Sequence, residues 1–231
     1  MRLDPDEWAL VHDRRAARDF LFWRGLELCV EVCAERIRPG ALWVDVGSGT
    51  GHLAGALAAL GARTIGLDHD PRMTRYARRR WPGAFAAADA FSLPLPDGSC
   101  AGLVAVSLLG CLGDPAGLLA EAARVLAPHG TLCLSAMNRH SLLLPAAKLA
   151  AWRGRRNAAR YTAYDPAALA AAARRAGLLP ERQILYGHLS PLGSRGPSAL
   201  ERARRREAQV SPGTRSAWAR QILLVATRQA T

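Results

Sequence analysis

The stretch VDVGSGTGHL, residues 44–53, decides the fold of this chain. It begins as a short apolar run and passes through Gly47, Gly49 and Gly51 into a helical segment at 51–60. Glycines at such a strand-to-helix turn permit a tight bend and let backbone N–H groups approach a ligand closely. A turn without any ligand is the simpler interpretation, but the acidic residues around this one favour a binding loop.

Strands and helices alternate on both sides of this stretch. We predict strands at 41–47, 62–68, 84–89, 102–109, 129–137, 178–189 and 220–228, and helices within 6–37 and at 51–60, 71–80, 114–126, 165–176 and 198–209. Alternation at this spacing indicates βαβ units. We therefore expect an α/β fold with a Rossmann-like, doubly wound sheet of seven strands. The sheet is mostly parallel, and its last strand, 220–228, is antiparallel.

Three acidic residues lie where predicted strands end, and a parallel sheet binds ligands at that edge. Asp45 precedes the first glycine, where a carboxylate suits a ligand with an amino group better than a pyrophosphate. Asp68 ends the second strand, the position from which an acid binds the two hydroxyls of a ribose. Asp89 ends the third strand, within reach of an adenine edge. These acids give the glycine loop a specificity that it lacks alone.

Four runs of the chain resemble a known motif series. VDVGSGTG, GLDHDPRM, AADAFSLPLPDGS and ARVLAPHGTLCLSAMN are similar to the motifs of class I S-adenosylmethionine-dependent methyltransferases, in the small-molecule branch called type 11. The resemblance covers residues 41–138 and extends weakly to 164–178. It implies an enzyme that uses S-adenosyl-L-methionine to methylate O or C of a small, lipophilic or aromatic acceptor.

The resemblance also implies which residues contact the cofactor, all of them at or just after strand ends. The methionine part packs against Gly47, Ser48, Gly49 and Gly51, and Asp45 helps to hold its amino group. The ribose is bound by Asp68. The adenine is flanked by His69 and Met73, and its edge meets Asp89 and Ala90. The pocket near the methyl group is lined by Ser107.

Two other functions fit parts of the sequence. Gly49 and Gly51, with Gly55, mimic the fingerprint of a nicotinamide dehydrogenase, although the acids at the strand ends have no place in one. Gly110 and Cys111 stand where relatives often carry polar groups that face the substrate. That departure also leaves open a non-catalytic scaffold that only binds the cofactor.

Methyl transfer needs a base only if the acceptor must lose a proton, because the cofactor is already activated. His140 follows the fifth predicted strand at the mouth of the pocket and is the preferred catalytic base. His12, on the N-terminal helix, is a second candidate for catalysis or for contact with a ligand. Other titratable candidates are Tyr161, Tyr164 and His188.

The charge of the chain is concentrated in its C-terminal part. Residues 1–138 hold 14 Lys and Arg against 15 Asp and Glu, whereas residues 139–231 hold 17 against 4. We predict one methyltransferase domain over 1–231, with N-terminal cap helices at 1–40 and a cofactor-binding core at 41–138.

The two substrate-side segments, 139–163 and 189–217, cover the predicted pocket in that domain. The first pairs an apolar stretch with the cationic run RGRR, a composition that also suits peripheral contact with an anionic membrane, and similar inserts occur in quinone-biosynthesis O-methyltransferases. Lid helices are the simpler interpretation. An acidic carrier-bound substrate is an alternative, and RNA is the least favoured, because no aromatic residues interleave with the arginines of 202–206.

Length and cysteine content exclude several classes of protein. Half of the 231 residues are apolar, which excludes global disorder, and five cysteines are too few for a disulfide scaffold. Cys29 and Cys33 are four residues apart, but no nearby Cys or His pair completes a metal site, so we predict no metal and interpret all five cysteines as small buried side chains. The N-terminal sequence MRLDPDEW resembles no signal peptide, and we expect a cytoplasmic protein.

Overall fold

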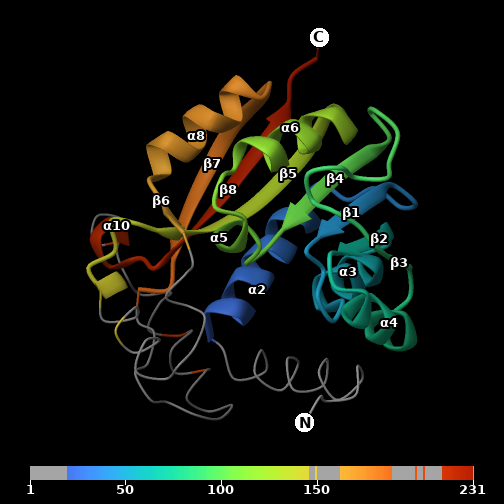
Figure 1. The fold of residues 1–231 in the computed structure, drawn as a ribbon, viewed down its shortest axis with the longest axis horizontal. Helices are drawn as coiled ribbons and strands as arrows, with labels where there is room; N and C mark the ends of the chain where they lie inside the picture. Colours follow the sequence, from blue (N-terminus) through green and yellow to red (C-terminus); the bar gives the residue numbers. More distant parts are fainter. Residues whose placement is uncertain are drawn as a thin grey trace.

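The computed structural model describes residues 20–145, 149, 162–188, 201, 205 and 215–230. Their strands form one mixed sheet in the order β3-β2-β1-β4-β5-β8-β7 (Figure 1). The bounds are β1 Leu42–Val46, β2 Arg63–Asp68, β3 Ala84–Ala87, β4 Cys100–Ala105, β5 Leu126–Asn138, β7 Leu178–Tyr186 and β8 Gln221–Arg228. β8 pairs antiparallel with both β5 and β7, while β1 to β5 pair parallel. The predicted Rossmann-like fold is confirmed.

An eighth strand adds to the seven that the sequence predicts. β6, Ala163–Tyr164, pairs parallel with the end of β5 and lies off the main path of the sheet. A strand of two residues carries no periodicity that a sequence pattern can reveal. It brings the segment before the helix at 166–175 to the carboxyl end of β5.

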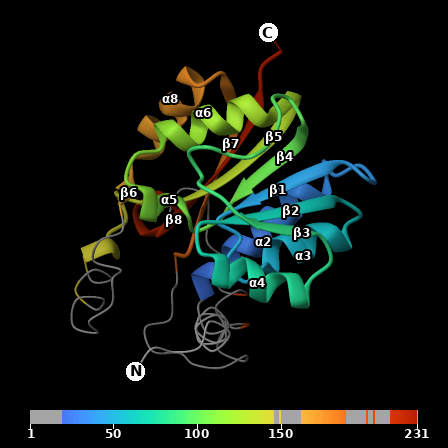
Figure 2. The same ribbon diagram turned by 45° about the vertical axis from the view of Figure 1, so that its right-hand side comes forward.

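Helices cover both faces of the sheet (Figures 1 and 2). One face carries α2 Phe20–Ala34, α3 His52–Ala59 and α4 Pro71–Arg80. The other face carries α5 Leu109–Leu112, α6 Ala116–Val125 and α8 Pro166–Arg175. The short helix α10, Arg215–Trp218, precedes β8. The first helix predicted within 6–37 and nearly all of the basic helix at 198–209 fall outside the described residues.

Side chains of the central strands alternate between two apolar clusters. Leu132, Leu134 and Ala136 of β5 pack with α6 and α8. Cys133, between them, packs on the opposite face with α2. This period of two is expected of a strand covered by helices on both faces, and it makes the middle of the sheet the core of the molecule.

Two helices begin as the sequence predicts. The Asp165 carboxylate caps α8 by accepting the N–H groups of Ala167 and Ala168, and Pro166 occupies the first turn. Asp70 caps α4 in the same way, with Pro71 following it. These local signals therefore fix where both helices leave the carboxyl edge of the sheet.

The ends of two predicted strands need correction. β4 ends at Ala105 rather than at residue 109, because Ser107 adopts a φ of +63° and the chain then turns into α5. β5 begins at Leu126 rather than at residue 129. A non-glycine residue at positive φ is strained, and such strain often marks a functional site.

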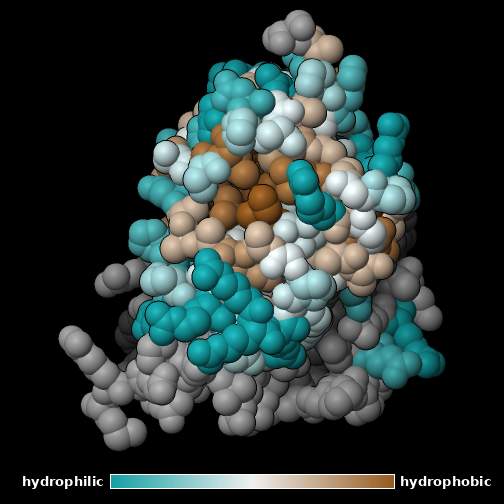
Figure 3. All heavy atoms as spheres, turned by 90° about the vertical axis from the view of Figure 1, so that its right-hand side faces the viewer, coloured by the Kyte–Doolittle hydropathy of each residue, from teal (hydrophilic) through white to brown (hydrophobic). Residues whose placement is uncertain are grey.

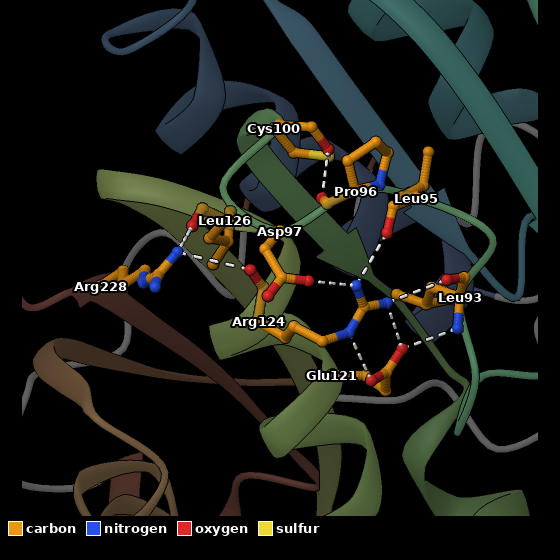
Figure 4. A network of polar contacts seen from close by, with 10 residues as sticks. Leu93, Leu95, Pro96, Asp97, Cys100, Glu121, Arg124, Leu126 and Arg228 are labelled. Carbon is orange, nitrogen blue, oxygen red and sulfur yellow. Dashed lines mark hydrogen bonds and ion pairs between the residues drawn. The ribbon is translucent and has the colours of Figure 1, made fainter.

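Arg124 of α6 anchors the turn-rich loop at 91–99 (Figure 4). Its guanidinium donates to both carboxylate oxygens of Glu121 at 2.8 Å and to the Asp97 carboxylate at 2.7 Å. It also donates to the carbonyl oxygens of Leu95 and Leu93, at 2.8 and 2.9 Å. The hydrogen bonds that Arg124 donates to Glu121 and then to Asp97 raise the pKa of Arg124 above its ordinary value, so the charge is permanent.

We expect Arg124→Ala to lower the free energy of unfolding by about 2 kcal/mol, because several charge-assisted hydrogen bonds are lost and backbone carbonyls of the loop lose their donor. Thermal and chemical denaturation measure this loss. Arg75→Ala, which removes an exposed arginine of α4, is the matched control and should shift stability by less than about 0.5 kcal/mol. Equal effects of the two substitutions would show that the network does not anchor the loop.

Candidate cofactor site

The carboxyl ends of four neighbouring strands come together at one edge of the sheet. The pairing of Val46 with Leu67 sets the ends of β1 and β2 level, and that of Asp68 with Ala87 does the same for β2 and β3. β4 lies on the other side of β1. The residues that the resemblance assigns to the cofactor therefore follow adjacent strands, as the sequence analysis expects.

The glycine loop after β1 is held by its backbone. The N–H groups of Gly47 and Ser48 donate to the Leu67 carbonyl at 2.7 and 2.9 Å, and Gly51 N–H donates to Ser48 O at 2.9 Å. Gly47, Gly49 and Gly51 all have positive φ, at 74°, 51° and 85°. Glycine is the residue that adopts this conformation without strain.

The three glycines differ in what surrounds them. A Cβ at Gly47 would lie 2.9 Å from Leu108, and one at Gly51 would lie 2.7 Å from Trp81, so protein packing excludes side chains there. A Cβ at Gly49 would meet no atom of the described residues within 4 Å. Gly49 therefore leaves open space above the loop, where a ligand can approach the backbone.

Asp68 joins the loop to the end of β2. One of its carboxylate oxygens accepts the Gly49 N–H at 2.8 Å, and the other accepts the Asp70 N–H at 2.9 Å. Each carboxylate oxygen has a second lone pair, so Asp68 can still accept two further hydrogen bonds. Two adjacent hydroxyls of a ribose are donors that fit this capacity.

Asp45 lies beneath the loop rather than at its surface. Only 3% of the residue is exposed, and its carboxylate accepts the Ala54 N–H at 3.1 Å at the start of α3. Burial raises the pKa of Asp45 to about 7, and the nearby Asp68 charge adds to this effect, whereas the hydrogen bond from Ala54 opposes it. A buried acid that is so easily neutralised would be stabilised as an anion by a cationic group of a ligand.

The remaining predicted cofactor residues are placed in different ways. Ser48 is buried, and its hydroxyl, which faces Gly66 of β2, has no hydrogen-bond partner among the described residues. Ser107 donates its N–H to the Ser135 hydroxyl at 2.7 Å, which fixes the strained turn after β4. His69 and Asp89 are exposed, Ala90 is half-buried and Met73 is buried on α4. With the open space at Gly49, these side chains fit an adenosine-containing cofactor.

Trp81 is a residue of this region that the sequence analysis missed. It follows α4, and its indole N–H donates to the Thr50 carbonyl at 2.9 Å, inside the glycine loop. Its ring fills the space beside Gly51 and Gly55, where a Cβ at Gly55 would lie 2.3 Å from a ring carbon. Packing against Trp81 thus explains Gly55, the residue that gave the dehydrogenase interpretation its fingerprint.

His140 lies after β5, next to the start of α8. Its Nε2 is 2.5 Å from the carboxylate of Asp165, and its backbone N–H donates to the Asn138 side chain at 3.0 Å. Its side chain is 58% exposed and lines a groove of about 330 Å³ with Asn138, Pro166 and Leu185 among other residues. The Asp165 carboxylate holds the imidazole in one orientation.

The other titratable candidates divide into three cases. Tyr164 donates its hydroxyl to the Leu109 carbonyl at 2.9 Å, and burial raises its pKa, so it supports the chain after β4. His188 is buried. His12 and Tyr161 lie outside the described residues, as do most of the predicted lid segments.

A second groove lies at the opposite ends of the strands. It has a volume of about 540 Å³ and is lined mainly by small or apolar residues at the starts of β2 and β3, including Thr64, Ile65 and Ala84. Figure 3 looks onto the side of the molecule that carries β3 and α4, and shows apolar side chains gathered above a hydrophilic band. Because ligands of such sheets bind at the carboxyl ends, this groove is not the expected cofactor site.

Residues 44–134 match the family model described as a methyltransferase domain. The match covers less than half of the chain, and over that range the chain is similar to this family. The matched range begins in β1 and ends in β5, so it contains the glycine loop and the ends of β2, β3 and β4.

Named relatives agree with the match. The chain is 33% identical over 114 residues to the ubiquinone biosynthesis O-methyltransferase of Xanthomonas campestris, covering 47% of this chain and 48% of that protein. It is 37% identical over 92 residues to the demethylmenaquinone methyltransferase of Tropheryma whipplei, covering 38% of each. The chain thus spans less than half the length of these curated relatives.

The fold of the methyltransferase domain is also found among solved structures. A chain in a complex between the Haloferax volcanii Trm112 methyltransferase activator and a methyltransferase matches with a TM-score of 0.66 and 24% identity, over 100% of both chains. This likeness concerns the fold. No helix among the described residues combines the length and the apolar character needed to cross a membrane.

Proposed function

We propose that this protein transfers a methyl group from S-adenosylmethionine to oxygen or carbon of a small, lipophilic acceptor. The observation that carries the proposal is the contact between Gly49 N–H and the Asp68 carboxylate beneath open space at Gly49. A ligand can approach the backbone of Gly49 closely there, and the Asp68 carboxylate beside it can accept hydrogen bonds from a ribose. The named methyltransferase relatives support it.

The residues of the carboxyl edge would hold the cofactor in defined parts. Asp68 would accept the ribose hydroxyls, Asp45 would stabilise the amino group, and Ser48 and Gly49 would meet the methionine part. His69, Met73, Asp89 and Ala90 would surround the adenine, and Ser107 would lie near the methyl group. The cofactor supplies a methyl group that its sulfonium already activates, so the protein has to align the acceptor and exclude water.

The names of two relatives support the proposed class of acceptor. One belongs to ubiquinone biosynthesis and the other methylates demethylmenaquinone. Both names refer to quinone compounds. We therefore place the acceptor of this chain among small aromatic or quinone-like compounds.

The test is transfer of radiolabelled methyl from S-adenosylmethionine to a panel of catechols, hydroxyquinols and demethylated quinols, with an acidic carrier-bound acceptor and RNA as comparison substrates. We expect turnover on at least one ring compound. Tight binding of S-adenosylhomocysteine without turnover on any panel member would instead identify a non-catalytic scaffold.

We propose further that His140 accepts the proton of a hydroxyl acceptor, with Asp165 orienting its imidazole. His140→Gln should lower kcat for a phenolic acceptor by about 100-fold near neutral pH, the lower range for general base catalysis. Binding of S-adenosylhomocysteine should not change. Raising the pH should restore the rate in the variant, because the acceptor then ionises in solution. An unaltered pH profile of kcat would remove His140 from the mechanism.

Contact with an anionic membrane stays a prediction from the sequence. The segments that suggest it, 139–163 and 189–217, lie mostly outside the described residues. Vesicles containing anionic lipid, with neutral vesicles as the control, measure this contact directly. Binding only to the anionic vesicles, lost at high salt, is the expected result.

A further inference from the structure

Three cysteines from distant parts of the chain meet in the core. Cys29 and Cys33 lie four residues apart on one face of α2, and Cys133 lies in the middle of β5. We call these residues the trithiol cluster. It packs on the α2 face of the sheet among apolar residues such as Val32 and Leu223, so it lies apart from the carboxyl-edge site.

The spacing of the three sulfur atoms is that of a metal site. The Sγ atoms of Cys29 and Cys33 are 4.0 Å apart, and those of Cys33 and Cys133 are 3.9 Å apart. All three lie within 4.8 Å of one another. An ion at the centre of three sulfurs, with metal–sulfur bonds of about 2.3 Å, needs sulfurs about 4.0 Å apart. The cluster can therefore bind an ion with little movement of the backbone.

Two arginines lie near the cluster. Arg36 is partly exposed and pairs with Glu181 at 2.6 Å, and the positive charges of Arg36 and Arg182 act on Cys133. Since thiolates and not thiols bind metals, an ion held by the three sulfur atoms has to displace their protons.

The number of ligands indicates the kind of ion. Within the described residues the cluster contains no fourth His, Cys, Asp or Glu ligand atom. Structural zinc usually takes four protein ligands. Three sulfur ligands in an apolar setting suit a soft ion that accepts three-coordination, such as Cu(I).

We propose that the trithiol cluster binds one soft metal ion through three sulfur atoms. On binding, each ligand thiol releases its proton to solvent and three metal–sulfur bonds form. No electron is transferred. Packing of three free thiols as small apolar side chains is the alternative that the experiment must exclude.

The experiment titrates the reduced full-length chain with Cu(I) against a chromophoric Cu(I) chelator, without oxygen. The exposed Cys111 is replaced by serine in every sample, so that it cannot compete for the ion. We expect one Cu(I) per chain by native mass spectrometry. X-ray absorption should show three sulfur neighbours at about 2.3 Å.

Variants identify the ligands. Cys33→Ala and Cys133→Ala should each weaken Cu(I) binding more than about 100-fold. Removing a residue that only orients a metal ligand already lowers metal affinity by about 10- to 100-fold, and removing the ligand itself lowers it further. Cys100→Ala is the matched control, because it removes a buried thiol outside the cluster and should leave binding unchanged. Binding of S-adenosylhomocysteine reports that each variant is folded.

Three results would overturn the proposal. One is the absence of stoichiometric Cu(I) binding to the chain with Cys111 replaced. Another is binding that survives Cys33→Ala. A third is an X-ray absorption spectrum with fewer than three sulfur neighbours, which does not depend on any cluster variant folding.

Discussion

Asp68→Ala is expected to weaken the binding of S-adenosylhomocysteine by at least about 100-fold, because two hydrogen bonds from ribose hydroxyls to a charged acceptor are lost. The same change also frees the Gly49 N–H, which donates to Asp68 at 2.8 Å, and loosens the glycine loop. Both effects lower affinity. Isothermal titration calorimetry measures the change directly.

The control for this prediction is Asp97→Ala. Asp97 is an exposed acid in the loop before β4, and its carboxylate contacts Arg124. It therefore lies at the start of β4, away from the carboxyl ends of the strands where Asp68 lies. Its loss should not alter binding of S-adenosylhomocysteine. If Asp68→Ala binds as tightly as the unaltered protein, the ribose is not at the end of β2.

Asp45→Asn is expected to stabilise the protein while it weakens cofactor binding. Burial raises the pKa of Asp45 from 3.8 to about 7, so the folded protein holds a proton that the unfolded chain releases between these values. Stability from this group is therefore fully present below about pH 4 and is lost as the pH rises through about 7. Above that pH, folding buries the negative charge of the Asp45 carboxylate, which destabilises the folded protein.

The asparagine variant removes this cost and keeps an acceptor for the Ala54 N–H. A shift of about 3 pKa units corresponds to roughly 4 kcal/mol at most, and we expect a gain of about 2–4 kcal/mol at pH 8 that shrinks toward zero near pH 4. Denaturation at a series of pH values measures it. Asp97→Asn, an exposed change, should show no such gain, and a destabilised Asp45→Asn at pH 8 would contradict the account.

Local patterns in the sequence were sufficient to predict much of the fold. The glycine loop and the acid at the end of β2 are recognised because each follows a predicted strand, and Asp165 with Pro166 predicts the start of α8. These features depend on neighbours in the chain, where residue type determines backbone conformation. The structure places them at one edge, as parallel strands require.

Contacts between distant residues were not predictable in the same way. Trp81 supports a loop 31 residues earlier, and Cys133 meets Cys33 across 100 residues. Nothing near either residue in the sequence marks its partner. Cys111 is exposed, contrary to the prediction that all five cysteines are buried, because the chain turns into α5 after β4 instead of continuing as a strand.

A crystal structure with S-adenosylhomocysteine tests the central claim most directly. We predict that the ribose hydroxyls contact the Asp68 carboxylate, that the methionine part lies over Gly49, and that the amino group points toward Asp45. Adenosine bound in the groove lined by Thr64 and Ile65, at the other end of the strands, would contradict the account.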